Sequence, residues 1–184
     1  MTKTPRAALE RTNMHVWEAV QTKRAIREFR AEPLSSDHID RILNAGRRSQ
    51  SSKNSQPWRF IAVQDKERLA ALAATGAGMG HVAGCALCVV IVVPTQNERT
   101  LWHFFDSGQS AAYMQLAATE IGIGSCLGTI YEPDVAAEIL GIPEGFQTRL
   151  VISFGYPADA SVAAQPLRAG GRRLFADVVH WETW

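Results

Sequence analysis

Two groups of polar residues have the types and spacing that could do chemistry. The segment from Lys23 to Arg27 carries the cations Lys23, Arg24 and Arg27 at the end of an expected helix. Cationic side chains that converge can bind one doubly charged phosphate. The same segment also fits a solvated basic turn that satisfies the dipole at a helix C-terminus. Arg172 and Arg173 form a second cationic pair with the same two interpretations, and the residues alone leave both open.

The second group is the run from Asn54 to Trp58, which follows the polar residues 49–53. Amides such as those of Asn54 and Gln56, placed just before an expected strand, suit hydrogen bonds to the polar edge of a heterocycle. The alternative is a hydrophilic turn that leads into an edge strand. This group also stays open on residue types alone.

The other candidate groups form no catalytic or metal-binding pattern. Cys85 and Cys88 have the spacing of a redox or metal pair, but they open an apolar run that predicts a buried strand, where the two thiols would point to opposite faces. We expect these thiols and Cys126 to be buried and reduced. The glycine runs 76–80 and 122–128 lack the strand-to-helix context of a dinucleotide fingerprint. We therefore assign no acid, base, nucleophile or metal ligand.

The elements that must position these groups predict an α+β fold. Patterns of apolar residues, caps and glycines predict helices at residues 14–23, from Ser35 or Ser36, and at 66–74, 101–121 and 133–140; strands at 58–63, 85–93 and 150–154; a glycine-rich loop at 75–84; and a strand or loop at 122–130. We expect residues 1–13 to be a flexible N-terminus and residues 14–184 to form one domain.

Composition narrows the classes of partner. The chain has 184 residues and a net charge of +1, so no electrostatic footprint indicates nucleic acid or a membrane surface. The N-terminal residues lack the apolar core of a secretory signal, and we expect a cytoplasmic protein. The helix expected at 101–121 is rich in Gly, Ala and Ser. Small residues allow close helix packing, either within the chain's core or across a dimer interface.

Taken in order, the motifs resemble the FMN-dependent nitroreductase family. The resemblance runs from Trp17 to Trp184, and its first two motifs are the most specific. The motifs are Lys23-Arg24-Ala25-Ile26-Arg27-Glu28-Phe29, Ser51-Ser52-Lys53-Asn54-Ser55-Gln56-Pro57-Trp58-Arg59-Phe60, Asp106-Ser107-Gly108-Gln109, Gly122-Ile123-Gly124-Ser125-Cys126, Gly141-Ile142-Pro143-Glu144-Gly145 and Val178-Val179-His180-Trp181.

The resemblance implies an intertwined homodimer, a sheet flanked by helices, with two FMN sites at the interface. It assigns the FMN phosphate to Lys23, Arg24 and Arg27, helped by Arg172 or Arg173. It assigns contacts with the flavin and ribityl chain to Asn54 and Gln56, and contacts from the partner subunit to Ser51 and Ser52. It assigns contacts with the face of the flavin ring to Leu127, Gly128 and Thr129, where a backbone N–H can reach N5 of the flavin.

Three positions depart from the family pattern. Ala25 stands where the family usually has Ser, which removes one hydroxyl from the phosphate site. Gln50 replaces the usual Pro before Ser51. The segment after Cys126 is one residue shorter than the common form. The stretch 74–84, which in this family often covers the substrate, is also brief, so we expect an open pocket.

The implied activity is transfer of hydride from NAD(P)H, through FMN, to a small oxidised substrate by a ping-pong mechanism. A nitroaromatic, a quinone, an enone or another flavin would fit as acceptor. Two alternatives remain: a flavin-binding module without NAD(P)H turnover, and a family variant that carries out flavin fragmentation or reductive dehalogenation. The cofactor supplies the chemistry in such enzymes, so no catalytic side chain is assigned.

Overall fold

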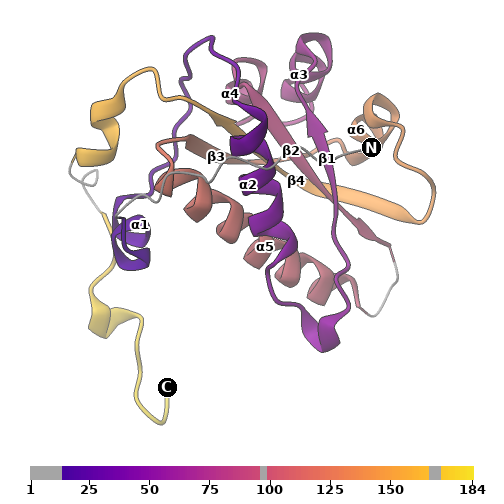
Figure 1. Cartoon of the computed structure of the whole chain (residues 1–184). Coiled ribbons are helices and arrows are strands. Elements are labelled where there is room, and N and C mark those ends of the chain that lie inside the picture. Colours follow the sequence, from indigo (N-terminus) through magenta and orange to yellow (C-terminus); the bar gives the residue numbers. More distant parts are fainter. Residues whose placement is uncertain (1–13, 96–98, 166–170) are drawn as a thin grey trace, which may run out of the picture.

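The fold is a four-stranded antiparallel sheet between two layers of helices (Figure 1). The computed structural model describes residues 14–95, 99–165 and 171–184. The strand order is β1-β2-β4-β3, formed by β1 (Arg59–Val63), β2 (Leu87–Pro94), β4 (Phe146–Gly155) and β3 (Gly124–Thr129). The apolar β2 lies in the centre and is buried along nearly all its length, as expected for a strand covered on both faces.

Alternating side chains of β2 divide the core in two. Leu87, Val89 and Ile91 face α2 (Ser36–Arg47) and α5 (Thr100–Glu120), whereas Cys88 and Val90 face the layer of α3 (Lys66–Ala73), α4 (Gly80–Ala83) and α6 (Pro133–Leu140). The helix α5 packs against both α2 and the sheet. None of the helices in the described parts of the chain is long and apolar enough to cross a membrane.

Most expected elements are confirmed, with three differences. The helix α6 has the expected bounds, and Ser35 caps α2 by accepting a hydrogen bond from the backbone N–H of His38 at 3.3 Å. The residues 122–130, left open between strand and loop, form β3. The loop expected at 75–84 contains the short helix α4, and β4 begins at Phe146 rather than at Leu150. Pairing with β2 extends β4, which the local apolar pattern could not indicate.

The strand expected from Cys85 begins at Leu87, which changes the position of the first thiol. Cys85 precedes the strand, so alternation does not separate it from Cys88, and both thiols lie in the same buried cluster. Burial raises the pKa of Cys85 to about 11 and raises that of Cys88 as well. Both cysteines are free thiols.

The N-terminal helix and the C-terminal tail leave large apolar side chains uncovered. In α1 (Val16–Thr22), Trp17 is 68% exposed, and only Ala19 is buried. The tail (yellow in Figure 1) extends away from the sheet and exposes Phe175 and Trp181. The expected apolar face of the first helix is therefore present, but this chain does not cover it. Residues 1–13 lie outside the described residues, and the single domain at 14–184 stays a prediction.

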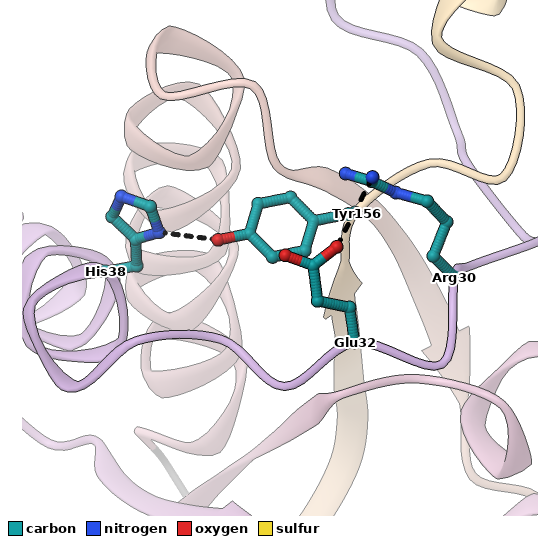
Figure 2. A network of polar contacts seen from close by, with 4 residues as sticks. All are labelled: Arg30, Glu32, His38 and Tyr156. Atoms are coloured by element: carbon teal, nitrogen blue, oxygen red, sulfur yellow. Dashed lines mark hydrogen bonds and ion pairs between the residues drawn. The ribbon is translucent and has the colours of Figure 1, made fainter.

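An extended segment follows α1 and crosses the edge of the sheet. Ala25 forms a parallel bridge with Ser125, and Phe29 forms an antiparallel bridge with Pro157. Figure 2 shows how the end of this segment is held: the Arg30 guanidinium lies 4.9 Å from the centre of the Tyr156 ring and pairs with Glu32 at 3.3 Å. Tyr156 also shares a hydrogen bond of 3.1 Å with Nδ1 of His38 on α2. These contacts fix the path of the residues after the basic cluster.

Candidate functional site

The basic segment divides its side chains between two sides. Lys23 is the C-cap of α1, and the residues after it run extended beside β3. In an extended chain, alternate side chains point to opposite sides. Arg24 and Ile26 line a cavity of about 370 Å³, which places Lys23 and Arg27 on the other side of the segment. The three cations of the motif therefore do not all converge.

Lys23, Arg27 and Arg172 are the cations that the fold brings together. Burial lowers the pKa of Lys23, and the nearby positive charges of Arg172 and Arg27 lower it further, whereas the Cys126 thiol acts in the opposite direction. Burial is the largest cause of the shift, and the two arginines add positive charge around the lysine. Such a site favours an anion. Of the two arginines considered in the tail, Arg172 is the one whose charge acts on Lys23.

Arg24 is turned toward the end of α1. Its Nη1 donates hydrogen bonds to the carbonyl oxygens of Gln21 at 2.7 Å and Lys23 at 3.2 Å, and Nη2 donates to that of Gln165 at 3.5 Å. The bonds to Gln21 and Lys23 satisfy carbonyls that a helix leaves open at its C-terminus. Its predicted contact with a phosphate stays a prediction, and this arrangement gives the guanidinium another role.

The predicted ring-face residues lie on β3, an edge strand. Leu127 and Thr129 are exposed, and Gly128 between them is buried. A side chain at Gly128 would lie 2.9 Å from Val151 and 3.1 Å from Met79, and one at Gly76 would lie within 2.3 Å of the Thr129 carbonyl oxygen. The segment 75–81 therefore packs closely against the face of β3 that contains Gly128. Leu127 and Thr129 lie on the other face, which stays exposed.

Sequence reasoning missed His81, which lies behind the same strand. Its Nδ1 shares a hydrogen bond of 2.7 Å with Oγ of Ser153, and its Nε2 is buried without a hydrogen-bond partner among the described residues. Burial lowers the pKa of His81, as does the charge of Arg27, and the Leu127 carbonyl opposes them. A single histidine in a glycine-rich stretch gave no signal for this position.

Cys126 on β3 is a buried thiol beside the cations. Burial raises its pKa, and the charges of Arg27 and Lys23 only partly oppose that effect. A thiol with a raised pKa is a poor nucleophile. In the described parts of the chain, the acidic, cysteine and histidine side chains form no group that could hold a metal ion.

The loop before β1 carries the predicted flavin contacts Ser51, Ser52, Asn54 and Gln56. This loop lies near the start of α5, whereas the basic segment lies near the end of that helix. The backbone N–H of Ser52 donates to Asp106, whereas Ser125, beside the basic segment, accepts from Gln115. Asp106 and Gln115 are separated by about 14 Å along the helix axis. Figure 1 shows the loop and the basic segment at opposite ends of α5. Within one chain, the two groups of predicted contacts lie at different places.

This loop has an unusual backbone. Lys53, Asn54 and Gln56 have φ values of 52°, 54° and 46°, in the left-handed region that residues other than glycine rarely adopt. Each such residue costs on the order of 1–3 kcal/mol and is commonly found at functional sites. The hydroxyl of Ser51 accepts a hydrogen bond of 2.9 Å from the backbone N–H of Gln56, which closes the loop. The side chains of Ser52, Asn54 and Gln56 are exposed.

Comparison with known proteins agrees with this fold. The sequence profile of the Nitroreductase family matches residues 20–79 and 77–156. A protein of Archaeoglobus fulgidus, provisionally named NADH dehydrogenase/NAD(P)H nitroreductase, is 29% identical over 171 residues, which cover 90% of this chain and 96% of the relative. The NADPH-flavin oxidoreductase of Vibrio harveyi is 27% identical over 155 residues, covering 76% of this chain and 65% of the relative.

A solved structure extends the comparison to the whole fold. The FMN-dependent nitroreductase of Clostridium difficile R20291 superposes with a TM-score of 0.79 at 25% identity, covering 91% of this chain and 99% of that one. The match confirms both the resemblance drawn from the motifs and the predicted α+β fold class. The family profile spans most of the chain, including the basic segment, the loop before β1 and the strand β3. The chain therefore belongs to the nitroreductase family.

Proposed function

We propose that this protein is an FMN-dependent oxidoreductase that passes reducing equivalents from NAD(P)H to a small oxidised acceptor. The observation that carries the proposal is the convergence of Lys23, Arg27 and Arg172: burial lowers the pKa of the lysine, and the charges of the two arginines lower it further. The names of the relatives, NAD(P)H nitroreductase and NADPH-flavin oxidoreductase, support the same reaction class.

The residues present fit one terminal phosphate. A phosphate placed among Lys23, Arg27 and Arg172 would neutralise their charge through charge-assisted hydrogen bonds. FMN ends in such a phosphate, whereas FAD would require a site for a pyrophosphate, and the chain has no dinucleotide fingerprint. Ala25 supplies no hydroxyl, so the cations would provide most of the binding to the phosphate.

The rest of the proposed site comes from two copies of the chain. Leu127, Gly128 and Thr129 would lie against the flavin, and Ser51, Ser52, Asn54 and Gln56 would reach it from the partner subunit. This arrangement is supported by the position of the loop at the far end of α5 from the basic segment. It also brings a second copy to the large apolar side chains that this chain leaves exposed, among them Trp17, Phe105 and Trp181. Exposed patches of this kind mark interaction surfaces.

Bound FMN would supply the redox chemistry, which is hydride transfer from NAD(P)H to the acceptor in a ping-pong cycle. The protein's residues have binding roles. The cations hold the phosphate, and the loop's amides and hydroxyls bind the polar edge of the ring and the ribityl chain. The packing of 75–81 behind β3 fixes the strand on which the ring lies. Nitroaromatics, quinones, enones and flavins are the acceptor classes we propose.

The test begins with the purified protein. Heat-released cofactor analysed by chromatography should be FMN, and stopped-flow mixing with NADH and NADPH should bleach the flavin absorbance. Release of FAD, or failure to bind FMN on reconstitution, would contradict the proposed cofactor. Bound FMN that neither NADH nor NADPH reduces would instead identify a flavin-binding module. Screening acceptors in steady state then identifies the substrate class.

A further inference from the structure

The motif from Asp106 to Gln109 acquires a role from its contacts. Asp106 is only 2% exposed, although it is a carboxylate in the second turn of α5. Its Oδ2 accepts a hydrogen bond of 3.2 Å from the backbone N–H of Ser52, and its Oδ1 accepts one of 3.3 Å from Nε2 of Gln109. A buried carboxylate is retained where donors satisfy it, and one of its donors is the backbone of the loop before β1.

Gln109 ties the loop at a second point. Its Oε1 accepts a hydrogen bond of 2.7 Å from Nε2 of Gln50. The helix therefore holds the residues on both sides of Ser51, one through a side chain and the other through its backbone N–H. We call Asp106, Gln109 and Gln50 the loop clamp.

The backbone of the loop gives a reason for the clamp. Lys53, Asn54 and Gln56 all have left-handed φ values, a conformation that persists only where surrounding contacts impose it. Within the loop, the hydrogen bond from the Gln56 N–H to the Ser51 hydroxyl closes the turn. It does not connect the loop to the rest of the fold, whereas the clamp connects the loop to α5.

We propose that Asp106 and Gln109 are positioning residues that hold the loop 51–56 in its strained conformation, so that its exposed hydroxyls and amides are preorganised for a ligand. The inference that this ligand is FMN rests on the proposed function. Preorganisation matters because contacts with a ligand weaken when a loop must first be ordered. Asp106 and Gln109 need not touch the cofactor.

The experiment measures the loop directly, before any cofactor is added. Trypsin cleaves after Lys53, which is exposed, so opening of the loop appears as faster cleavage there. Asp106→Asn replaces one acceptor oxygen with an NH₂ group facing a donor, and Gln109→Ala removes the link to Gln50. In the full chain without FMN, each should speed cleavage after Lys53 by about five- to tenfold, the effect of about one hydrogen bond. Glu144→Gln, at an exposed position, is the control for loss of a carboxylate.

Cleavage after Arg149 in β4 distinguishes local opening of the loop from a general loss of stability, because that peptide bond lies within the sheet. The clamp predicts no change there. Unchanged cleavage after Lys53, or an equal rise at both sites, would overturn the proposal. A double-mutant cycle adds a second check: Gln50→Ala combined with Gln109→Ala should be cleaved no faster than the faster single variant. Additive effects would show that the two amides act separately.

FMN titration then separates the clamp from the proposed function. With the clamp and the site both correct, Asp106→Asn and Gln109→Ala bind FMN about five- to tenfold more weakly than the parent. If the loop opens and FMN affinity stays within about twofold of the parent, the clamp stands and the proposed contact between loop and FMN is wrong. Weaker binding without faster cleavage after Lys53 would overturn the clamp.

Discussion

Lys23 and Arg24 are neighbours in the sequence but have different surroundings. Burial lowers the pKa of Lys23, and the charges of the nearby Arg172 and Arg27 lower it further. Arg24 donates to three backbone carbonyls on the other side of the segment. The alternation of an extended chain explains the difference, and it divides a motif that reads as one basic cluster into a candidate phosphate site and a helix-capping arginine.

This division gives a test by substitution. Arg27→Ala should weaken FMN binding by roughly ten- to a hundredfold, because a hydrogen bond to a charged group contributes about 1.5–3 kcal/mol and each 1.4 kcal/mol is about tenfold in affinity. Arg24→Ala should bind FMN within about twofold of the parent, because the Arg24 guanidinium is engaged by backbone carbonyls. Flavin fluorescence on titration of the apoprotein measures both. A tenfold loss for Arg24→Ala would show that the motif, and not this geometry, describes its role.

The lowered pKa of Lys23 predicts a pH dependence of FMN binding. As the pH rises toward that pKa, the lysine loses its proton and the phosphate loses a cation, so affinity should already fall at pH values below the usual lysine pKa of 10.5. Lys23→Arg stays protonated over this range and should bind FMN with a flatter profile. Dissociation constants measured across the range for both proteins decide the matter. Parallel profiles would mean that Lys23 does not face the phosphate.

At the scale of elements, the loop before β1 and the helix α5 form one unit. The loop carries three left-handed residues and is tied to α5 at Gln50 and Ser52. The segment 75–81 supports β3 in a comparable way through close packing at Gly128. Both groups of proposed flavin contacts therefore lie on short segments fixed by neighbouring elements, as a preorganised site requires.

The strain in the loop can be measured at Lys53. Glycine adopts a φ of 52° without steric cost, so relief of strain should offset the greater entropy of glycine in the unfolded chain. We expect Lys53→Gly to change the free energy of unfolding by less than about 0.5 kcal/mol. Arg68→Gly, inside α3, should lower it by about 1 kcal/mol. Equal losses for the two variants, measured by urea denaturation, would contradict a strained conformation at Lys53.

At the scale of the whole molecule, α5 has two different sides. Ala111 is 1% exposed and packs in the core with Ile42 and Met114, whereas Ala112 is exposed. One of the two roles that composition left open is therefore observed, because one side of the helix packs within the chain. The other side is exposed, and there we propose that a second copy binds. The apolar side chains exposed on α1 and the tail add to that surface.

The two sides predict different results for neighbouring substitutions. Ala112→Arg should shift the protein from dimer to folded monomer and lower bound FMN, since a charge would lie in the proposed interface. Ala111→Leu should instead lower the free energy of unfolding by about 1–3 kcal/mol through overpacking. Light scattering, circular dichroism and flavin absorbance distinguish these outcomes. A parent protein that is a flavin-loaded monomer would contradict the dimer.

Local signals in the sequence determined much of the element pattern. Pro133 and Gly141 mark the two ends of α6, where the glycine takes a φ of 64°. Ser35 marks the start of α2 by capping it, and the apolar run of β2 indicates a strand covered on both faces. These signals act within a few residues, so the sequence expresses them directly. The order of the short motifs along the chain, which the sequence also shows directly, indicated the family.

Tertiary structure alone decided how the candidate residues are grouped. The bond from Ser52 to Asp106 joins positions 54 residues apart, and that from His81 to Ser153 joins positions 72 apart. The charge of Arg172 acts on Lys23, although the two residues lie far apart in the sequence. Such pairings depend on strand order and on which face of a helix meets the sheet. The sequence therefore determined which residues could bind a phosphate and a heterocycle, and packing decided which of them lie together.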